Sequence, residues 1–208
     1  MRALSMSLTL AMLLSLLLLT GCAVGTVRDL VAKGGAGPAK GLGKTILVAK
    51  VDLPPESAER MEKAERIVAL ARQAFEGVPD VELLPAETLQ SRLPGRDLIG
   101  ASDAELAAAA LDAGADTVVL VQVLGYGGEL SVSFPPVYWL VTLDYAYHAR
   151  VIDARTGALY LDAHRGKRSS NAYAVSGREA LAERFKADFA ALMGDAREIS
   201  GSKTASGS

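Results

Sequence analysis

Hydrophobic residues recur along this chain with two different periods, and the periods predict an α/β domain. Segments rich in β-branched and apolar residues predict strands, whereas apolar residues spaced three and four apart predict amphipathic helices. The predicted elements are, in order, a strand at 45–53, a helix at 56–76, a strand at 81–84, a short helix at 86–93, a helix at 103–113, a strand at 117–124, a hairpin with arms at 138–152 and 158–167, and a helix at 177–193. This order indicates a mixed sheet with helices packed on it.

Two of these segments define the predicted core most clearly. The 117–124 segment is apolar at nearly every position, which is typical of a central strand that is covered on at least one face. In the 138–152 segment, apolar and polar residues alternate, which predicts one buried and one wetter face. The predicted buried face carries Trp139, Val141, Leu143, Tyr145, Tyr147, Ala149 and Val151, and the wetter face carries Thr142, Asp144, His148 and Arg150. A tight turn at 153–157 joins the two arms of the hairpin.

Composition divides the chain into four parts. The predicted parts are a signal peptide at 1–21, a lipidated flexible tether at 22–44, a single α/β domain at 45–194 and a polar disordered tail at 195–208. The tether is assigned because it is rich in glycine and poor in core-forming residues, with one helical turn expected at 27–32. The polar composition of the tail predicts disorder in the same way.

The predicted signal peptide ends in a motif with its own chemistry. Arg2 precedes an apolar run that is too short for a comfortable membrane span and that ends in Leu19, Thr20, Gly21 and Cys22. This ending resembles the bacterial lipobox, in which the cysteine thiol receives a diacylglycerol and the chain is cleaved just before it. Cys22 is the only cysteine, so no intramolecular disulfide can form. The alternative is a secreted protein with a stray cysteine near its cleavage site.

A lipidated Cys22 has a consequence for location. Several acyl chains on one residue give effectively permanent anchoring, so the mature protein is expected to be attached to the membrane without spanning it. By resemblance to bacterial lipoproteins, the residue after the cysteine influences sorting, and Ala23 is not the aspartate that commonly retains them in the inner membrane. We therefore expect the inner leaflet of an outer membrane, facing the periplasm.

Charge and motif patterns argue against nucleic-acid and nucleotide binding. The chain has 22 basic and 24 acidic residues, which leaves no strong electrostatic footprint for nucleic acid. The segment 38–45 resembles a phosphate-binding loop, but Pro38 stands where that pattern needs glycine, and a strand rather than a helix is predicted to follow. We expect no cofactor apart from the covalent lipid.

Catalytic and metal-binding motifs are also weak. The chain has no G-x-S-x-G motif, and its two histidines, His148 and His164, lie on the two arms of the predicted hairpin. Asp144 and Asp162 are the carboxylates that a metal site there would recruit, with His148 expected opposite about Asp162. The histidines are not at a motif spacing, so we interpret them as a surface polar pairing and predict no metal.

The segment between the predicted strands at 117–124 and 138–152 suggests a contact role. Glycines after residue 124 predict a mobile loop, and an aromatic segment follows it. Aromatic residues are favoured at interface centres and at membrane–water boundaries, so Tyr126, Phe134 and Tyr138 are the candidate partner contacts. Trp139 is in phase with the buried face and is predicted to be core. The alternative is an ordinary loop leading into a core strand.

Two short segments carry a family resemblance. The chain reads A-G-A-D-T-V-V at 113–119 and A-R-V-I-D-A-R-T-G at 149–157. Together with the lipobox, these segments resemble the envelope lipoproteins of the CsgG, LpoB and PelC type, which share an α/β domain with the amino-terminal domain of TolB. The resemblance covers about 45–193.

The resemblance implies a function as well as a fold. Members of that group serve in curli secretion, polysaccharide export and activation of peptidoglycan synthases, usually through docking or assembly. It therefore implies a non-catalytic docking or assembly factor with an envelope protein partner or a self-oligomer. An envelope hydrolase or metal-dependent enzyme, and a small-ligand carrier lipoprotein, are the alternatives.

Overall fold

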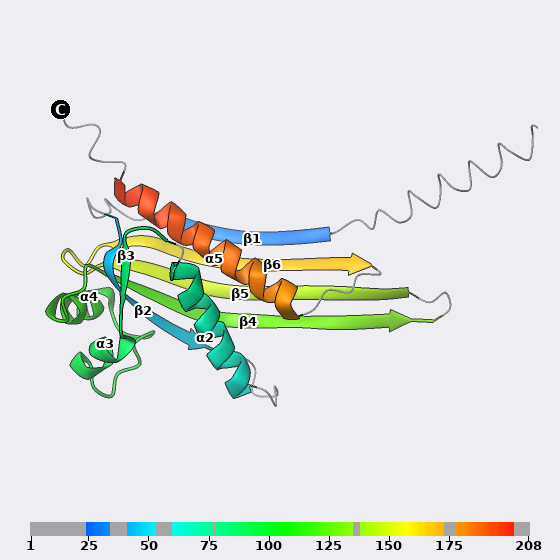
Figure 1. Cartoon of the computed structure of the whole chain (residues 1–208), viewed down its shortest axis with the longest axis horizontal. Helices are drawn as coiled ribbons and strands as arrows, with labels where there is room; N and C mark the ends of the chain where they lie inside the picture. The colour runs from blue at the N-terminus through cyan, green and yellow to red at the C-terminus, as the bar shows by residue number, and fades with distance from the viewer. Residues whose placement is uncertain are drawn as a thin grey trace, which may run out of the picture.

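The computed structural model describes residues 24–33, 41–52, 60–76, 78–134, 138–172 and 178–201, and a sheet of six strands lies at its centre. The strands are β1 (Val24–Lys33), β2 (Gly43–Val51), β3 (Val81–Leu84), β4 (Thr117–Ser133), β5 (Tyr138–Asp153) and β6 (Leu159–Ala172). The helices are α2 (Arg60–Glu76), α3 (Ala86–Arg92), α4 (Asp103–Asp112) and α5 (Arg178–Gly201). The predicted class, a mixed sheet with helices packed on it, is confirmed (Figure 1).

The strand order across the sheet is β1-β6-β5-β4-β2-β3. β2 runs parallel to both β3 and β4, while the β4–β5, β5–β6 and β6–β1 pairs are antiparallel. Helices α2 and α5 pack on one face of the sheet, and α3 and α4 pack on the other face at one end (Figure 1). Among the described residues, no helix is both long enough and apolar enough to cross a membrane.

The first half of β4 contributes to the core on both faces. Val119, Val121 and Val123 face α2 and α5, and Val118 and Leu120 face α3 and α4. All five side chains are nearly inaccessible to solvent. The continuous apolar run at this position confirms the prediction of a central strand.

Aromatic rings fill the core beneath α2 and α5. Phe185 of α5 meets Tyr147 of β5 edge to face, with ring centroids 5.5 Å apart, and Phe75 of α2 meets Phe189 in the same way at 5.6 Å. Burial of a side chain of this size contributes about 1.5–3 kcal/mol. The first contact attaches α5 to the sheet, and the second joins α2 to α5.

A second buried cluster lies between the sheet and helices α3 and α4. Contacts at the start of α4 attach this helix to the sheet. Ser102 caps the helix, because its hydroxyl accepts a hydrogen bond from the Glu105 amide while the Glu105 carboxylate accepts one from the Ser102 amide. The Ser102 hydroxyl and amide hold the pKa of Glu105 below its ordinary value. Arg150 of β5 donates to Asp103 Oδ1 and to the carbonyl of Ile99, both at 2.7 Å, which ties the helix start to the sheet.

The hairpin turn is organised by one buried carboxylate. Asp153 accepts hydrogen bonds from the amides of Arg155 and Thr156, at 2.6 and 3.1 Å, and from the Tyr160 hydroxyl. Gly157 follows with a φ of +67°, which glycine adopts without strain. The predicted tight turn at 153–157 is confirmed.

The glycine-rich segment before β2 has a packing role. Gly43 has a φ of +58°, and a Cβ atom added there would lie 2.7 Å from Asp116 Oδ2. That oxygen accepts a hydrogen bond from the Lys44 amide at 3.1 Å. A strand, rather than the helix that a phosphate-binding loop requires, follows this segment, as predicted.

The predicted tether is wrong over residues 24–33. This segment is β1, and it pairs antiparallel with β6 along its whole length, from Val24 opposite Ser170 to Lys33 opposite Leu161. No helical turn forms at 27–32, because the segment pairs as a strand with the edge of β6 and the backbone groups that face β6 find partners there. Residues 34–40 lie outside the described residues.

Three further predicted boundaries are wrong in the same direction. The predicted loop after residue 124 is strand as far as Ser133, and β6 continues beyond 167 to Ala172. The predicted disordered tail is helical from 195 to Gly201, with the Ala196 side chain fully buried. In each case contacts with neighbouring elements extend a segment whose local composition favours a turn or disorder. Residues 202–208 lie outside the described residues.

Candidate functional site

The sheet continues well beyond the helices that cover it. β2 pairs with β4 only as far as Val123, whereas β4 goes on to pair with β5 up to Ser133. We call this outer part the sheet arm; it consists of residues 125–133 of β4, 138–146 of β5 and 166–172 of β6. Figure 1 shows the three strands running past the ends of α2 and α5.

Apolar side chains lie exposed on the sheet arm. Leu130, Val132 and Phe134 are 63, 52 and 73% exposed, and together we call them the apolar strip. Leu130 pairs with Val141 and Val132 with Trp139, on the sheet face that α2 and α5 cover further inward. The strip therefore continues the core face of the sheet into a region that no helix of the described residues covers. Contiguous exposed apolar surface of this kind marks contact sites in soluble proteins.

The structure places the three predicted contact residues differently. Phe134 is exposed at the end of the apolar strip. Tyr126 is half-buried, and its ring meets Phe185 edge to face with centroids 6.0 Å apart, so it supports the core. Tyr138 pairs with Ser133 through the backbone, and its side chain lies outside the described residues. Trp139, predicted as core, is half-buried.

Sequence reasoning missed two members of the apolar strip. Leu130 and Val132 alternate with Phe134 at the period of two that is typical of a strand. That alternation was the available signal, but the glycines at 125, 127 and 128 indicated a loop instead.

The predicted lipobox residues, Leu19 to Cys22, lie outside the described residues, which begin with β1, and the register of β1 shows where in the sheet this strand starts. Val24, the first residue of β1, is in register with Ser170 of β6. Ser170 pairs with Thr142, and Thr142 pairs with Glu129 next to the apolar strip. β1 therefore begins at the arm end of the sheet.

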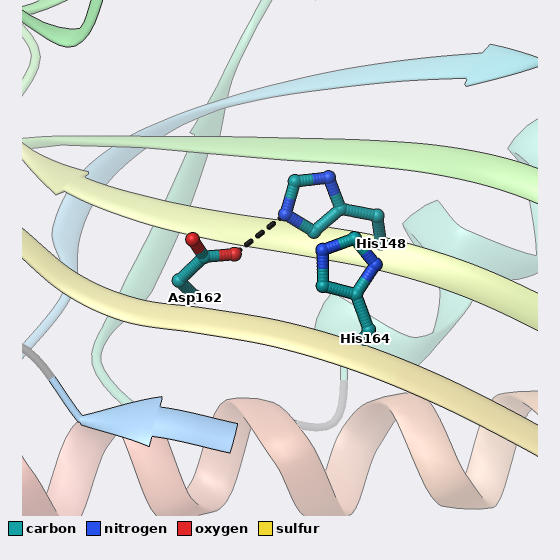
Figure 2. Close-up of side chains that lie close together, drawn as sticks. All are labelled: His148, Asp162 and His164. Carbon is teal, nitrogen blue, oxygen red and sulfur yellow. Dashed lines mark hydrogen bonds and ion pairs between the residues drawn. The ribbon is translucent and has the colours of Figure 1, made fainter. Parts of the chain in front are cut away.

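A histidine cluster lies on the opposite face, where no helix in the described part of the chain covers the middle of the sheet. Figure 2 shows His148 of β5 beside His164 and Asp162 of β6. Ligand atoms of these three residues all lie within 4.8 Å of one another, and Asp144 is not among them. The predicted polar pairing is present, because His148 Nε2 lies 2.5 Å from Asp162 Oδ1. The predicted register is wrong, since His148 faces His164 directly.

A groove of about 530 Å³ lies where α5 meets β5 and β6, and it bears on the carrier alternative. Its charged wall is built around Asp188, which accepts hydrogen bonds from Tyr147 at 2.9 Å and Lys167 at 3.1 Å. Burial, followed by the nearby Asp188 carboxylate, raises the pKa of the Tyr147 hydroxyl. The polar groups of Tyr147, Lys167 and Asp188 are therefore hydrogen-bonded to one another.

Comparisons with known proteins give similar structures without a family assignment. No protein-family model matches the chain, and no curated protein sequence matches it. A PelC dodecamer from Paraburkholderia phytofirmans has 19% sequence identity and a TM-score of 0.45, with 84% of this chain and 98% of that chain covered. Lipoprotein GNA1162 from Neisseria meningitidis has 17% identity and a TM-score of 0.41, covering 73 and 99%. The LpoB C-terminal domain from Salmonella enterica has 14% identity and a TM-score of 0.37, covering 64 and 86%.

Proposed function

We propose that this chain is a lipid-anchored, non-catalytic lipoprotein that docks or assembles proteins of the cell envelope at the periplasmic side of the outer membrane. One observation carries the proposal. The segment that follows Cys22 is the edge strand β1, and its first residue is in register with the sheet arm. The lipid and the apolar strip therefore belong to the same end of the sheet, and the anchor holds the strip close to the membrane surface.

The sheet arm offers two features that a protein partner would use. The apolar strip supplies side chains whose burial is favourable on binding. In addition, among the described residues, β2 is the strand on this side of β4, and its pairing ends at Val123. The backbone of β4 beyond Val123 therefore presents an edge to which a partner strand can add. A partner at the membrane surface would cover both features.

The anchor is tested by Cys22→Ser in the full chain. We expect the variant to keep its signal peptide and to lose lipid, because the thiol that accepts the diacylglycerol is gone. The mass of the purified chain and its distribution between membrane and soluble fractions measure both effects. A variant that is cleaved and membrane-bound like the wild type would contradict the lipoprotein assignment.

The docking surface is tested separately in the lipidated chain. We expect Leu130→Ser combined with Phe134→Ser to abolish chemical crosslinks to the envelope partner while processing and membrane attachment stay normal. Leu111→Ser is the matched control, because Leu111 is 50% exposed on α4, which lies at the end of the sheet opposite to the arm (Figure 1). If the double variant forms the same crosslinked product as the control, the apolar strip is not the docking surface.

A further inference from the structure

We propose that the histidine cluster, His148, Asp162 and His164, binds a divalent transition-metal ion of the zinc type. His148 and His164 are directly opposite on two antiparallel strands, where Cβ atoms are about 5 Å apart. Asp162 precedes His164 by two residues, so it projects from the same face of β6. Three donor groups thus rise from two adjacent strands toward one point, on the side of the sheet away from α5 (Figure 2).

The cluster lies within the sheet and not on its edge. β1 pairs with β6 at these positions, with Leu30 opposite His164 and Ala32 opposite Asp162. The side chain of His148 is 20% exposed and that of Asp162 is 36% exposed, while His164 is exposed. The paired strands therefore hold the backbones of the three residues in place, and one side of the cluster is open to solvent.

The neighbouring polar groups on this face are engaged elsewhere. Arg150, which is directly opposite Asp162, donates instead to Asp103 and to the Ile99 carbonyl. Gln122, directly opposite His148, donates to Asp52 at 2.7 Å. Among the described residues, His148 is therefore the polar partner of Asp162, and no cation competes with a metal ion for this carboxylate.

The spacing of the donors is close to what a metal ion requires. Zinc binds histidine nitrogen and carboxylate oxygen at about 2.0–2.2 Å, so two ligands of a tetrahedral ion lie about 3.4 Å apart. The donor atoms here lie within 4.8 Å of one another. The two imidazole rings are stacked, with centroids 3.8 Å apart and planes inclined by 5°, so one ring must turn for both nitrogens to reach the same ion. His164 is the ring that can turn, because it is exposed.

The open side of the cluster leaves room for a further ligand. The next row across the sheet consists of Gly125, Ala146 and Gly166, whose side chains end at the Cβ atom or are absent. Three protein ligands with a free fourth position are typical of zinc sites that hold a water molecule or an exchangeable ligand. Two imidazoles and a carboxylate suit zinc better than calcium or magnesium, which prefer oxygen ligands.

The test uses the full chain with Cys22→Ser, which removes the only thiol, after extraction with EDTA. Isothermal titration with Zn²⁺ is expected to give one saturable site per chain. His148→Gln and His164→Gln are each expected to weaken zinc binding at least tenfold, and Asp162→Asn is expected to weaken it in the same direction. Asp144→Asn is the matched control, because Asp144 lies on the same face of β5 outside the cluster, and it should leave zinc affinity unchanged.

A second measurement does not depend on a variant. His148 and His164 are the only histidines, so ¹⁵N spectra of the imidazoles report on this site alone. Zinc is expected to shift one nitrogen of each ring. The absence of a saturable site, zinc affinity unchanged when both histidines are replaced, or imidazole spectra that zinc leaves unaltered would each overturn the proposal.

Discussion

The inner and outer halves of β4 pair with β5 alike, but they differ in what covers them and in whether β2 pairs with their other side. Residues 117–123 and residues 125–133 both pair with β5 in an antiparallel ladder. The inner half is almost wholly buried between two layers of helices, whereas the outer half is half-buried or exposed. The pairing with β5 is the same in both halves, so the difference lies in side-chain burial and in the loss of β2 as a second neighbour. The comparison indicates that the inner half supplies stability and the outer half supplies a surface for contact.

The largest expected effect is the loss of stability on removing a phenylalanine ring from the covered core, compared with removing one from the sheet arm. Phe185→Ala deletes a fully buried ring that contacts Tyr126, Tyr145 and Tyr147, and it should lower the free energy of unfolding by about 3–5 kcal/mol. Phe134→Ala deletes an exposed ring and should change the free energy of unfolding by less than about 0.5 kcal/mol. Urea denaturation followed by circular dichroism measures both. Equal losses would show that the arm is as important to stability as the covered core.

A smaller effect is expected at the hairpin turn. Asp153→Ala removes the acceptor of two turn amides and of the buried Tyr160 hydroxyl, which should cost about 1–3 kcal/mol. Burial, followed by the hydrogen bond to Asp153, raises the pKa of Tyr160, so the hydroxyl stays protonated and needs an acceptor. Asp144→Ala, an exposed carboxylate on the arm, is the matched control. The same denaturation experiment would contradict this account if the two variants were equally stable.

The smallest effect is expected at the start of α4. Ser102→Ala removes the helix cap and should cost about 1 kcal/mol. Because Ser102 holds the pKa of Glu105 below its ordinary value, the variant should bring that pKa back toward 4.5, which an NMR titration measures. A carboxyl group whose pKa is lowered by folding stabilises the fold at pH values above its unfolded-state pKa. This contribution is lost as the pH falls through the folded-state pKa. A Glu105 pKa that is the same in both proteins would contradict the capping assignment.

The sequence was sufficient to predict the covered part of the fold. The apolar run of β4 reflects burial by helices on both faces of the strand. The alternation in β5 reflects burial by helices on one face. By contrast, the outer half of β4 is rich in residues with weak strand preference, and β1 combines valines that favour a strand with glycine, aspartate and lysine that do not. Their conformation is decided by pairing with β6 and β5, segments that lie far away in the sequence.

The candidate site was harder to predict because two irregularities shift the register. The bulge at Leu124 reverses which positions of β4 face the helices, so Tyr126 turns toward Phe185 and the apolar strip occupies even-numbered positions. The irregularity between Val151 and Ile152 in the β5–β6 ladder moves the partner of His148 by one residue, from Ala163 to His164, which accounts for part of the difference from the predicted register. Neither irregularity has a local signature that indicates its position.

The most direct test of the central claim is site-specific photocrosslinking in cells. A photoreactive amino acid is placed at Val132 in the apolar strip of the lipidated full chain and, for comparison, at Leu111 on α4. Both side chains are about half exposed, at 52 and 50%, so accessibility alone does not distinguish them. We predict a discrete adduct with an envelope protein from position 132 that disappears with Cys22→Ser, and no adduct from position 111. The same adducts from both positions, or none from position 132, would contradict the account.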